Sequence, residues 1–188
     1  MDVNGHGIHA ALISMSMRSL LPGLLRKVKD PTTIIEELNR HMYKLFKENP
    51  IKGLYNFPYF TAIVAILDTN EKYISYVNAG HPPGMIYPPD TNTVQLLSEG
   101  CMPIGLVEKL TIKKETIHYK TGANLLLYTD GLIEAPTKSE MILFNQIKKR
   151  FKQVCKVPNK NVLVQILIHR MAHSEITDDI CLIHSFLK

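Results

Sequence analysis

The chain has 188 residues, 45% of them hydrophobic, and a formal net charge of +5, which is sufficient for one domain with a substantial core. No apolar run approaches the roughly 18 residues of a membrane span, and the N-terminus lacks the basic-then-apolar order of a secretory signal. The three cysteines are widely spaced, without the pairing of a metal site or disulfide framework, so we expect a reducing, cytoplasmic compartment; they are Cys101, Cys155 and Cys181.

Two helices are predicted near the N-terminus. Residues 8–21 are mostly apolar, which indicates a helix buried on more than one side, and Pro22-Gly23 is expected to end it. A second helix is predicted to begin at Asp30-Pro31, a capping residue followed by proline at the first helical position. Its apolar residues recur at helical spacing on one face, at Ile34, Ile35, Leu38, Met42, Leu45 and Phe46.

The middle of the chain is typical of strands joined by short turns. A nearly continuous apolar strand is predicted over 59–67, and a polar turn at 68–70 returns the chain as an antiparallel partner over 72–78. Residues 79–84 interrupt this pattern, and a third strand is expected at 85–87.

Three further strands follow. They are expected over 94–97, over the alternating segment 110–119, and over the buried apolar run 125–128. Residues 101–106 are expected to be a loop, because a proline and a glycine interrupt them.

The C-terminal part predicts two helices, over 142–154 and 161–171, and a last strand over 180–186. Clustered strands with short turns indicate an antiparallel sheet system, and helices at either end indicate layers that cover it. The predicted fold class is therefore α+β rather than an alternating parallel sheet.

Basic residues gather in two regions, one with Lys109, Lys113, Lys114 and Lys120, the other with Lys148, Lys149, Arg150, Lys152 and Lys156. Such runs can attract nucleic acid or an acidic protein. Because no nucleic-acid motif or interleaved aromatic residues accompany them, we interpret them as solvated faces. A basic binding module with accidental acids is an alternative that salt-sensitive DNA binding would favour.

Acidic residues stand at three element boundaries. Asp2 opens a glycine-rich loop before a helix, Asp130 follows a strand and precedes Gly131, and Asp178-Asp179 stands before the last strand. Carboxylates without His or Cys partners favour hard cations such as Mg²⁺ or Mn²⁺. Two such ions, about 3.5–4 Å apart, can stabilise an in-line displacement at phosphorus. The alternatives are a simple Asp-Gly turn at Asp130 and a frayed, solvated terminus at Asp2.

Six segments, in this order and spacing, resemble the motifs of SpoIIE/RsbU-type phosphatases, the bacterial branch of the metal-dependent PPM serine/threonine phosphatases. They span residues 2 to 183 and are strong in combination. The matching segments are Asp2-Val3-Asn4-Gly5-His6-Gly7 with Ala10-Ala11-Leu12, Phe60-Thr61-Ala62, Tyr76-Val77-Asn78-Ala79-Gly80-His81-Pro82-Pro83, Pro103-Ile104-Gly105, Leu127-Tyr128-Thr129-Asp130-Gly131-Leu132-Ile133-Glu134-Ala135 and Thr177-Asp178-Asp179-Ile180.

The resemblance implies an antiparallel β-sandwich flanked by helix pairs, with two Mn²⁺ or Mg²⁺ ions at one end of it. Asp2 would bridge both ions, and the backbone carbonyl of Val3 would bind the second. Asp130 and Asp178 would hold the first ion, and Asp179 would support its neighbour. Gly5, His6, Gly7 and Gly131 would shape the surrounding loops. Asn78 and His81 would either shape the cleft or form only a self-satisfied turn.

The implied activity is hydrolysis of phosphoserine or phosphothreonine on a protein by a metal-bound hydroxide, without a phosphoenzyme. The implied substrate is a phosphorylated STAS-type anti-sigma-factor antagonist, as in bacterial sigma-factor regulation and signal transduction. The resemblance also allows an upstream sensor domain or a homodimer as partner. No nucleic-acid partner and no membrane span are expected.

The chain departs from the family at its start and near its end. The family has two further strands before this point and another acid in a Gly-Asp pair, so we expect a single, N-terminally incomplete domain over 1–188 that lacks the first strands and exposes a sheet edge. Cys181 stands where the family usually has Thr. The alternative is therefore a catalytically weak or inactive module that binds protein partners, or half of a site that another chain completes.

Overall fold

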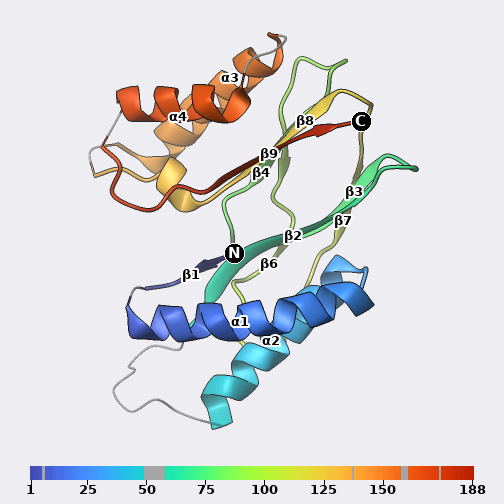
Figure 1. Cartoon of the computed structure of the whole chain (residues 1–188), viewed down its shortest axis with the longest axis vertical. Coiled ribbons are helices and arrows are strands. Elements are labelled where there is room, and N and C mark those ends of the chain that lie inside the picture. The colour runs from blue at the N-terminus through green and yellow to red at the C-terminus, as the bar shows by residue number, and fades with distance from the viewer. Residues whose placement is uncertain (6, 49–57, 137, 158–160, 174) are drawn as a thin grey trace. The chain divides into compact units, whose positions relative to one another are not determined.

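A computed structural model describes residues 1–188 except 6, 49–57, 137, 158–160 and 174 (Figure 1). The chain forms two compact units. The first unit comprises Met1–Asp68, Tyr73–His81 and Ser98–Ile117, and the second comprises Thr69–Lys72, Pro82–Leu97 and His118–Lys188. The single-domain organisation over 1–188 stays a prediction.

The first unit contains a sheet in the order β1-β2-β3-β6, with β7 also paired to β3. Strands β1–β2 and β2–β3 pair antiparallel, whereas β6 runs parallel to β3. The long β2–β3 hairpin confirms the predicted antiparallel pairing, with Asp68 opposite Tyr73 beside the turn. The strands are β1 (Asp2–Val3), β2 (Phe60–Asp68), β3 (Tyr73–Ala79), β6 (Gly100–Cys101) and β7 (Glu115–His118).

Helix α1 (Ile8–Lys27) shows that the predicted helix end at Pro22-Gly23 was wrong, because Pro22 lies inside the helix. Proline costs an interior helix a hydrogen bond. Leu20, Leu21 and Leu24 lie on both sides of this point and pack against the buried core. Their burial offsets the local cost, and the helix ends where the Val28 N–H donates to the Leu24 carbonyl at 2.9 Å.

Helix α2 (Pro31–Glu48) begins where the sequence predicted. The Asp30 carboxylate accepts hydrogen bonds from the Thr33 N–H and hydroxyl, both at 2.9 Å, which caps the first turn. The apolar face of α2 packs on β2 and β3. This packing forms a core of Ile13, Met17, Ile34, Ile35, Leu38, Met42, Phe60, Ala62, Val77, Ala79 and Ile104.

Two predictions in the first unit need correction. The predicted loop 101–106 begins in a strand, because Cys101 belongs to β6 and Ile104 forms an isolated bridge with Phe60. A Cβ on Gly100 would lie 1.8 Å from the Asn78 carbonyl oxygen, so only glycine allows this close pairing with β3. The strand predicted over 110–119 is confined to Glu115–His118.

The second unit has a sheet in the order β5-β4-β8-β9, antiparallel at every pairing. Its strands are β4 (Gly84–Tyr87), β5 (Gln95–Leu97), β8 (Ala123–Tyr128) and β9 (Leu182–Leu187). Helices α3 (Glu140–Cys155) and α4 (Val162–His173) confirm the two predicted helices, and they contact each other, β4 and β9.

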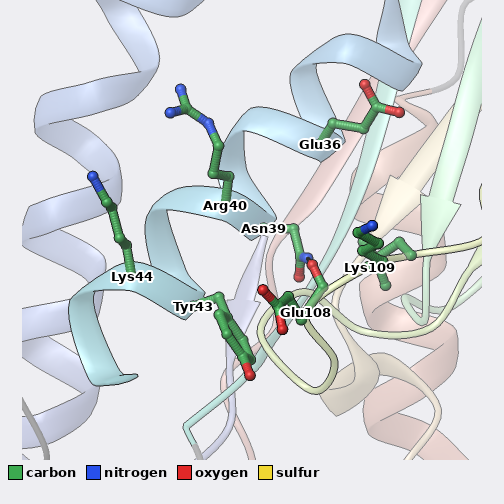
Figure 2. A pocket seen from close by; sticks show the side chains of 8 residues that line it. Glu36, Asn39, Arg40, Tyr43, Lys44, Glu108 and Lys109 are labelled. Atoms are coloured by element: carbon green, nitrogen blue, oxygen red, sulfur yellow. Dashed lines mark hydrogen bonds between the residues drawn. The ribbon is translucent and has the colours of Figure 1, made fainter. Parts of the chain in front are cut away.

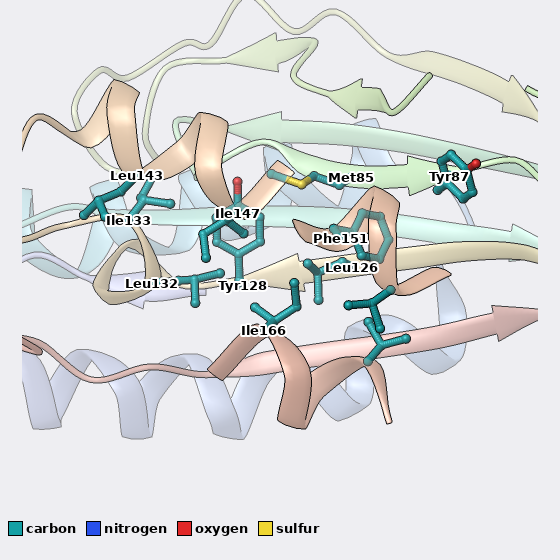
Figure 3. Close-up of a cluster of buried hydrophobic side chains, with 12 residues drawn as sticks. Met85, Tyr87, Leu126, Tyr128, Leu132, Ile133, Leu143, Ile147, Phe151 and Ile166 are labelled. Carbon is teal, nitrogen blue, oxygen red and sulfur yellow. The ribbon is translucent and has the colours of Figure 1, made fainter. Parts of the chain in front are cut away.

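Apolar side chains of both helices meet those of β4 and β8 in the core of the second unit. Figure 3 shows Ile147 and Phe151 of α3 and Ile166 of α4 among Met85, Leu126 and Tyr128. Because β8 is buried along most of its length, it gives the residues that follow it a rigid base.

The predicted α+β class with antiparallel sheets and helix pairs is confirmed. Over the described residues, no helix combines the length and apolar character needed to cross a bilayer. All three cysteines are free thiols.

Candidate metal centre

Asp130 follows the buried strand β8 after one residue, Thr129, and begins the 3-10 turn η1 (Asp130–Leu132). Its backbone carbonyl accepts hydrogen bonds from Ile133 and Glu134, at 2.7 and 2.9 Å. Its carboxylate accepts from the Gly131 N–H at 3.0 Å. The residue is half-buried, so a fixed backbone presents a carboxylate that solvent reaches.

The segment carrying Asp178 and Asp179 lies directly beside this turn. The Thr129 hydroxyl donates to the Asp179 carbonyl at 3.0 Å and accepts from the Cys181 N–H at 2.8 Å. The Thr129 N–H donates to the Cys181 carbonyl at 3.1 Å. Asp130 and Asp178, 48 positions apart in the sequence, are thus held on adjacent segments.

Gly131 makes this close approach possible. A Cβ at this position would lie 2.5 Å from the Asp179 carbonyl oxygen and 2.9 Å from that of Asp178. Real Cβ atoms do not approach backbone oxygens so closely, and backbone atoms cannot swing aside as a flexible side chain can. The absence of a side chain at Gly131 therefore leaves room for the neighbouring segment, since any side chain would separate the two segments.

Asp179 contacts the Asp178 carboxylate through its backbone. Its N–H donates to the Asp178 carboxylate at 2.7 Å, while its carbonyl accepts from Thr129. Both aspartates are exposed. A carboxylate restrained by a backbone N–H but open to solvent retains oxygen lone pairs for a cation.

Glu134 belongs to the same acidic group, although sequence reasoning gave it no role. Burial raises the pKa of its carboxyl, and the nearby charges of Asp130, Glu140 and Asp178 raise it further. The sequence spacing could have indicated this proximity, because Glu134 follows Asp130 by four residues, about one helical turn.

In the first unit, Asp2 is held by strand pairing rather than left in a frayed terminus, so that alternative was wrong. Strand β1 pairs antiparallel with β2, with Asp2 opposite Thr61 and Val3 opposite Phe60. The Asn4 N–H extends the pairing by donating to the Tyr59 carbonyl at 3.0 Å. Asp2 and Val3 are both half-buried.

Gly5 and Gly7 connect this strand to α1, and both have positive φ angles, 88° and 81°. A Cβ on either would meet no atom within 4 Å, so backbone conformation rather than space favours glycine here. The Gly7 carbonyl accepts the Ala11 N–H at 3.1 Å and begins the helix. His6 lies outside the described residues.

Asn78 and His81 form the self-satisfied turn that was one of the two readings for them. The Asn78 side chain donates to the His81 carbonyl at 2.9 Å and accepts the His81 N–H at 2.7 Å. The His81 ring Nδ1 and the Thr61 hydroxyl are 2.8 Å apart. Because Thr61 is the strand partner of Asp2, this turn is anchored to the residue opposite the predicted ligand.

The predicted ligand set is therefore divided between the units. Asp2, Val3, Gly5, Gly7, Asn78 and His81 belong to the first, and Asp130, Gly131, Asp178 and Asp179 to the second. Over the described part of the chain, no group of three or more His, Cys, Asp or Glu side chains is arranged to hold a metal ion. Within the second unit, adjacent segments present the carboxylates of Asp130 and Asp178, and carboxylate oxygens are the donors that a hard cation prefers.

The first unit also contains a cavity of about 560 Å³ beside α2. Figure 2 shows Asn39 directed from α2 toward the segment that carries Glu108. Side chains of both charge signs line this cavity, and no predicted site residue does, so it gives no indication of a ligand class. The lining residues are Glu36, Asn39, Arg40, Tyr43, Lys44, Glu108, Lys109 and Leu110.

Comparison with known proteins gives consistent matches along nearly the whole chain. The family model described as Stage II sporulation protein E (SpoIIE) matches residues 1–185. The chain is 35% identical over 183 residues to phosphoserine phosphatase RsbP of Bacillus subtilis (strain 168), which covers 97% of this chain and 43% of RsbP. It is 24% identical over 152 residues to phosphoserine phosphatase RsbU of the same organism, covering 81% of this chain and 43% of RsbU. The chain thus spans less than half the length of either relative.

Three solved structures establish the fold. The RsbU and RsbW domains of Rv1364c from Mycobacterium tuberculosis match with a TM-score of 0.78 at 23% identity, over 97% of this chain and 49% of that one. The PP2C phosphatase domain of SpoIIE from Bacillus subtilis, with a regulatory fragment, matches with a TM-score of 0.69 at 17% identity, over 96% and 51%. RsbX in complex with magnesium matches with a TM-score of 0.63 at 17% identity, over 96% and 75%.

Proposed function

Because the chain belongs to the SpoIIE family, whose matched structures are PP2C phosphatase domains, we propose that it hydrolyses phosphoserine or phosphothreonine on a protein with the help of divalent cations. The observation that carries this proposal is the adjacency of the Asp130 and Asp178 segments, fixed by Thr129 and Gly131. Two relatives are named phosphoserine phosphatases, which favours phosphoserine.

The proposed ligands are oxygen donors from both units. Asp2 and the Val3 carbonyl of the first unit, together with Asp130 and Asp178 of the second, would hold Mn²⁺ or Mg²⁺. The RsbX complex with magnesium supports a hard divalent ion. When bound, such ions activate water and neutralise charge on the transferring phosphoryl group.

Neighbouring residues restrain the positions of these proposed ligands. Asp179 donates its N–H to the Asp178 carboxylate, and the Gly131 N–H donates to that of Asp130. In the first unit, pairing with β2 restrains the backbone around Asp2 and Val3. Prepositioned donors lower the ordering cost of binding a charged group.

The proposed substrate is a small phosphorylated regulatory protein, of the STAS-type anti-sigma-factor antagonist class. Its support is the similarity to RsbP and RsbU. A homodimer or an upstream sensor domain as partner stays a prediction.

The test is Mn²⁺-dependent release of phosphate from p-nitrophenyl phosphate and from a phosphoserine peptide. Asp130→Asn keeps the size of the side chain but removes its charge. We expect the rate to fall about 10²–10³-fold, the scale for loss of one electrostatic stabiliser of a transition state.

Asp90→Asn is the matched control. Asp90 also belongs to the second unit but pairs with Lys120, and its replacement should leave the rate unchanged. No Mn²⁺-dependent turnover in the wild type, or equal rates for wild type and Asp130→Asn, would favour a phosphatase-like module that only binds partners.

A further inference from the structure

Arg170 is a large and fully buried side chain, with a relative exposure of 0%. It lies in α4, in a helix otherwise rich in Val, Leu and Ile. Burying a guanidinium is costly unless its N–H groups find acceptors. The acceptors that it uses therefore indicate what it does.

Three of those acceptors are backbone carbonyls outside α4. Arg170 Nε donates to the Leu132 carbonyl at 2.9 Å. One terminal nitrogen, Nη2, donates both to the Glu134 carbonyl and to the Glu175 carbonyl, the latter at 3.0 Å. Charge-assisted hydrogen bonds of this kind are stronger than those between neutral groups.

These carbonyls belong to the two segments that carry the proposed ligands. Leu132 and Glu134 follow Asp130 by two and four residues, and Glu175 precedes Asp178 by three. Thr129 and Gly131 join the same segments at the strand end. The guanidinium of Arg170 therefore forms a second connection between the two ligand segments, through hydrogen bonds from α4.

We propose that Arg170 is a positioning residue that sets the spacing of Asp130 and Asp178 and thereby the divalent-cation affinity of this half of the site. The inference rests on the proposed function, since it assumes that these two aspartates bind a cation. Arg170 touches backbone carbonyls rather than the reacting groups, so it acts through the segments it holds. Lysine would keep the charge but lack the rigid fork of donors.

The test measures Mn²⁺ binding by isothermal titration calorimetry for the wild type, Arg170→Met, Arg170→Lys and Arg150→Met. Arg150 is a matched control, because it belongs to α3 in the same unit and donates to Gln165 at 2.7 Å rather than to either ligand segment. We expect Arg170→Met to weaken Mn²⁺ binding about 10- to 100-fold, as loss of an outer partner of metal ligands does. Arg170→Lys should be intermediate, and Arg150→Met should match the wild type.

A kinetic readout separates positioning from general loss of structure. On a phosphoserine peptide, Arg170→Lys should raise the Mn²⁺ concentration for half-maximal rate, whereas the rate at saturating Mn²⁺ should stay within about twofold, as expected when the altered site is distant from the reacting atoms. Circular dichroism and metal-free thermal unfolding report whether each variant folds.

Folded Arg170→Met with wild-type Mn²⁺ affinity would overturn this inference alone. Failure of both Arg170 variants to fold would overturn it as well, because Arg170 would then serve the unit as a whole. A wild-type chain that binds no Mn²⁺ would instead overturn the proposed function on which the inference rests.

Discussion

Gly131 is the residue at which the smallest chemical change should disturb the site most directly. A methyl group at Gly131 would collide with the carbonyl oxygens of Asp178 and Asp179. We expect Gly131→Ala to destabilise the chain by about 1–3 kcal/mol, the usual cost of overpacking, and to weaken Mn²⁺ binding about tenfold by separating the ligand segments. Urea unfolding and calorimetric titration measure the two effects.

Gly23→Ala is the control for the effect of Gly131→Ala on Mn²⁺ affinity, because a Cβ at Gly23 would meet no atom within 4 Å. Equal Mn²⁺ affinity in Gly131→Ala and the wild type would show that the spacing of the two segments does not govern the site.

Asp30 gives the first unit a pH-dependent contribution to stability. Hydrogen bonds from Lys114 and then Thr33 lower the pKa of its carboxyl to about 2. Since the folded pKa lies below that of the unfolded chain, about 3.9, the contribution is fully present above the unfolded value and is lost as pH falls toward 2. The carboxylate is partly exposed, so solvent screens its pairing with Lys114.

We expect Asp30→Ala to lower the free energy of unfolding at pH 7 by about 0.5–2 kcal/mol, the cost of a lost helix cap. Asp30→Asn should keep much of the cap but not the charge, so its stability should vary less between pH 4 and pH 2. Urea unfolding across this range tests the pair. If Asp30→Asn keeps the pH dependence of the wild type, a group other than Asp30 causes that dependence.

Two residues of the site were not predictable from the sequence. Thr129 and Arg170 act by hydrogen bonds to backbone groups of distant segments, and no local pattern encodes such partners. The only sequence sign of Arg170 is a charge inside an apolar helix. The aspartates were found because their motifs stand in a recognisable order.

Among the elements, the long periodic ones were predictable and the short ones were not. Helix α2 and strands β2, β3 and β8 follow clear patterns and caps. Strand β6 has only two residues, too few for any periodicity. It exists because Gly100 lets its backbone approach Asn78, which is a tertiary contact.

Helix α1 shows how packing outweighs a local signal. Pro22-Gly23 is a normal helix end, yet α1 continues to Lys27. Gly23 therefore lies in the interior of a helix, where alanine has the higher helix propensity. We expect Gly23→Ala to stabilise the chain by about 0.5–1 kcal/mol in urea unfolding. Destabilisation would indicate that the helix ends near Pro22 in solution.

On the scale of the whole molecule, the positive charge is partly neutralised by ion pairs. Three lysines of the first basic region pair with acids: Lys113 with Glu99, Lys114 with Asp30, and Lys120 with Asp90. These pairs are exposed and contribute little stability. They nevertheless favour solvated faces over a nucleic-acid surface, as the sequence indicated.

The proposed ligands come from both units of the chain. Asp2 depends on its pairing with β2, whereas Asp130 and Asp178 depend on Thr129, Gly131 and Arg170. Under the proposed function all three carboxylates contribute to cation binding, so the test has to involve residues of both units.

The most direct measurement is a calorimetric count of Mn²⁺ ions bound by the wild type and by Asp2→Asn. We expect about two ions for the wild type and loss of affinity in Asp2→Asn although Asp130 and Asp178 are unchanged. Wild-type stoichiometry and affinity in a folded Asp2→Asn variant would contradict it, because the first unit would then contribute nothing to cation binding.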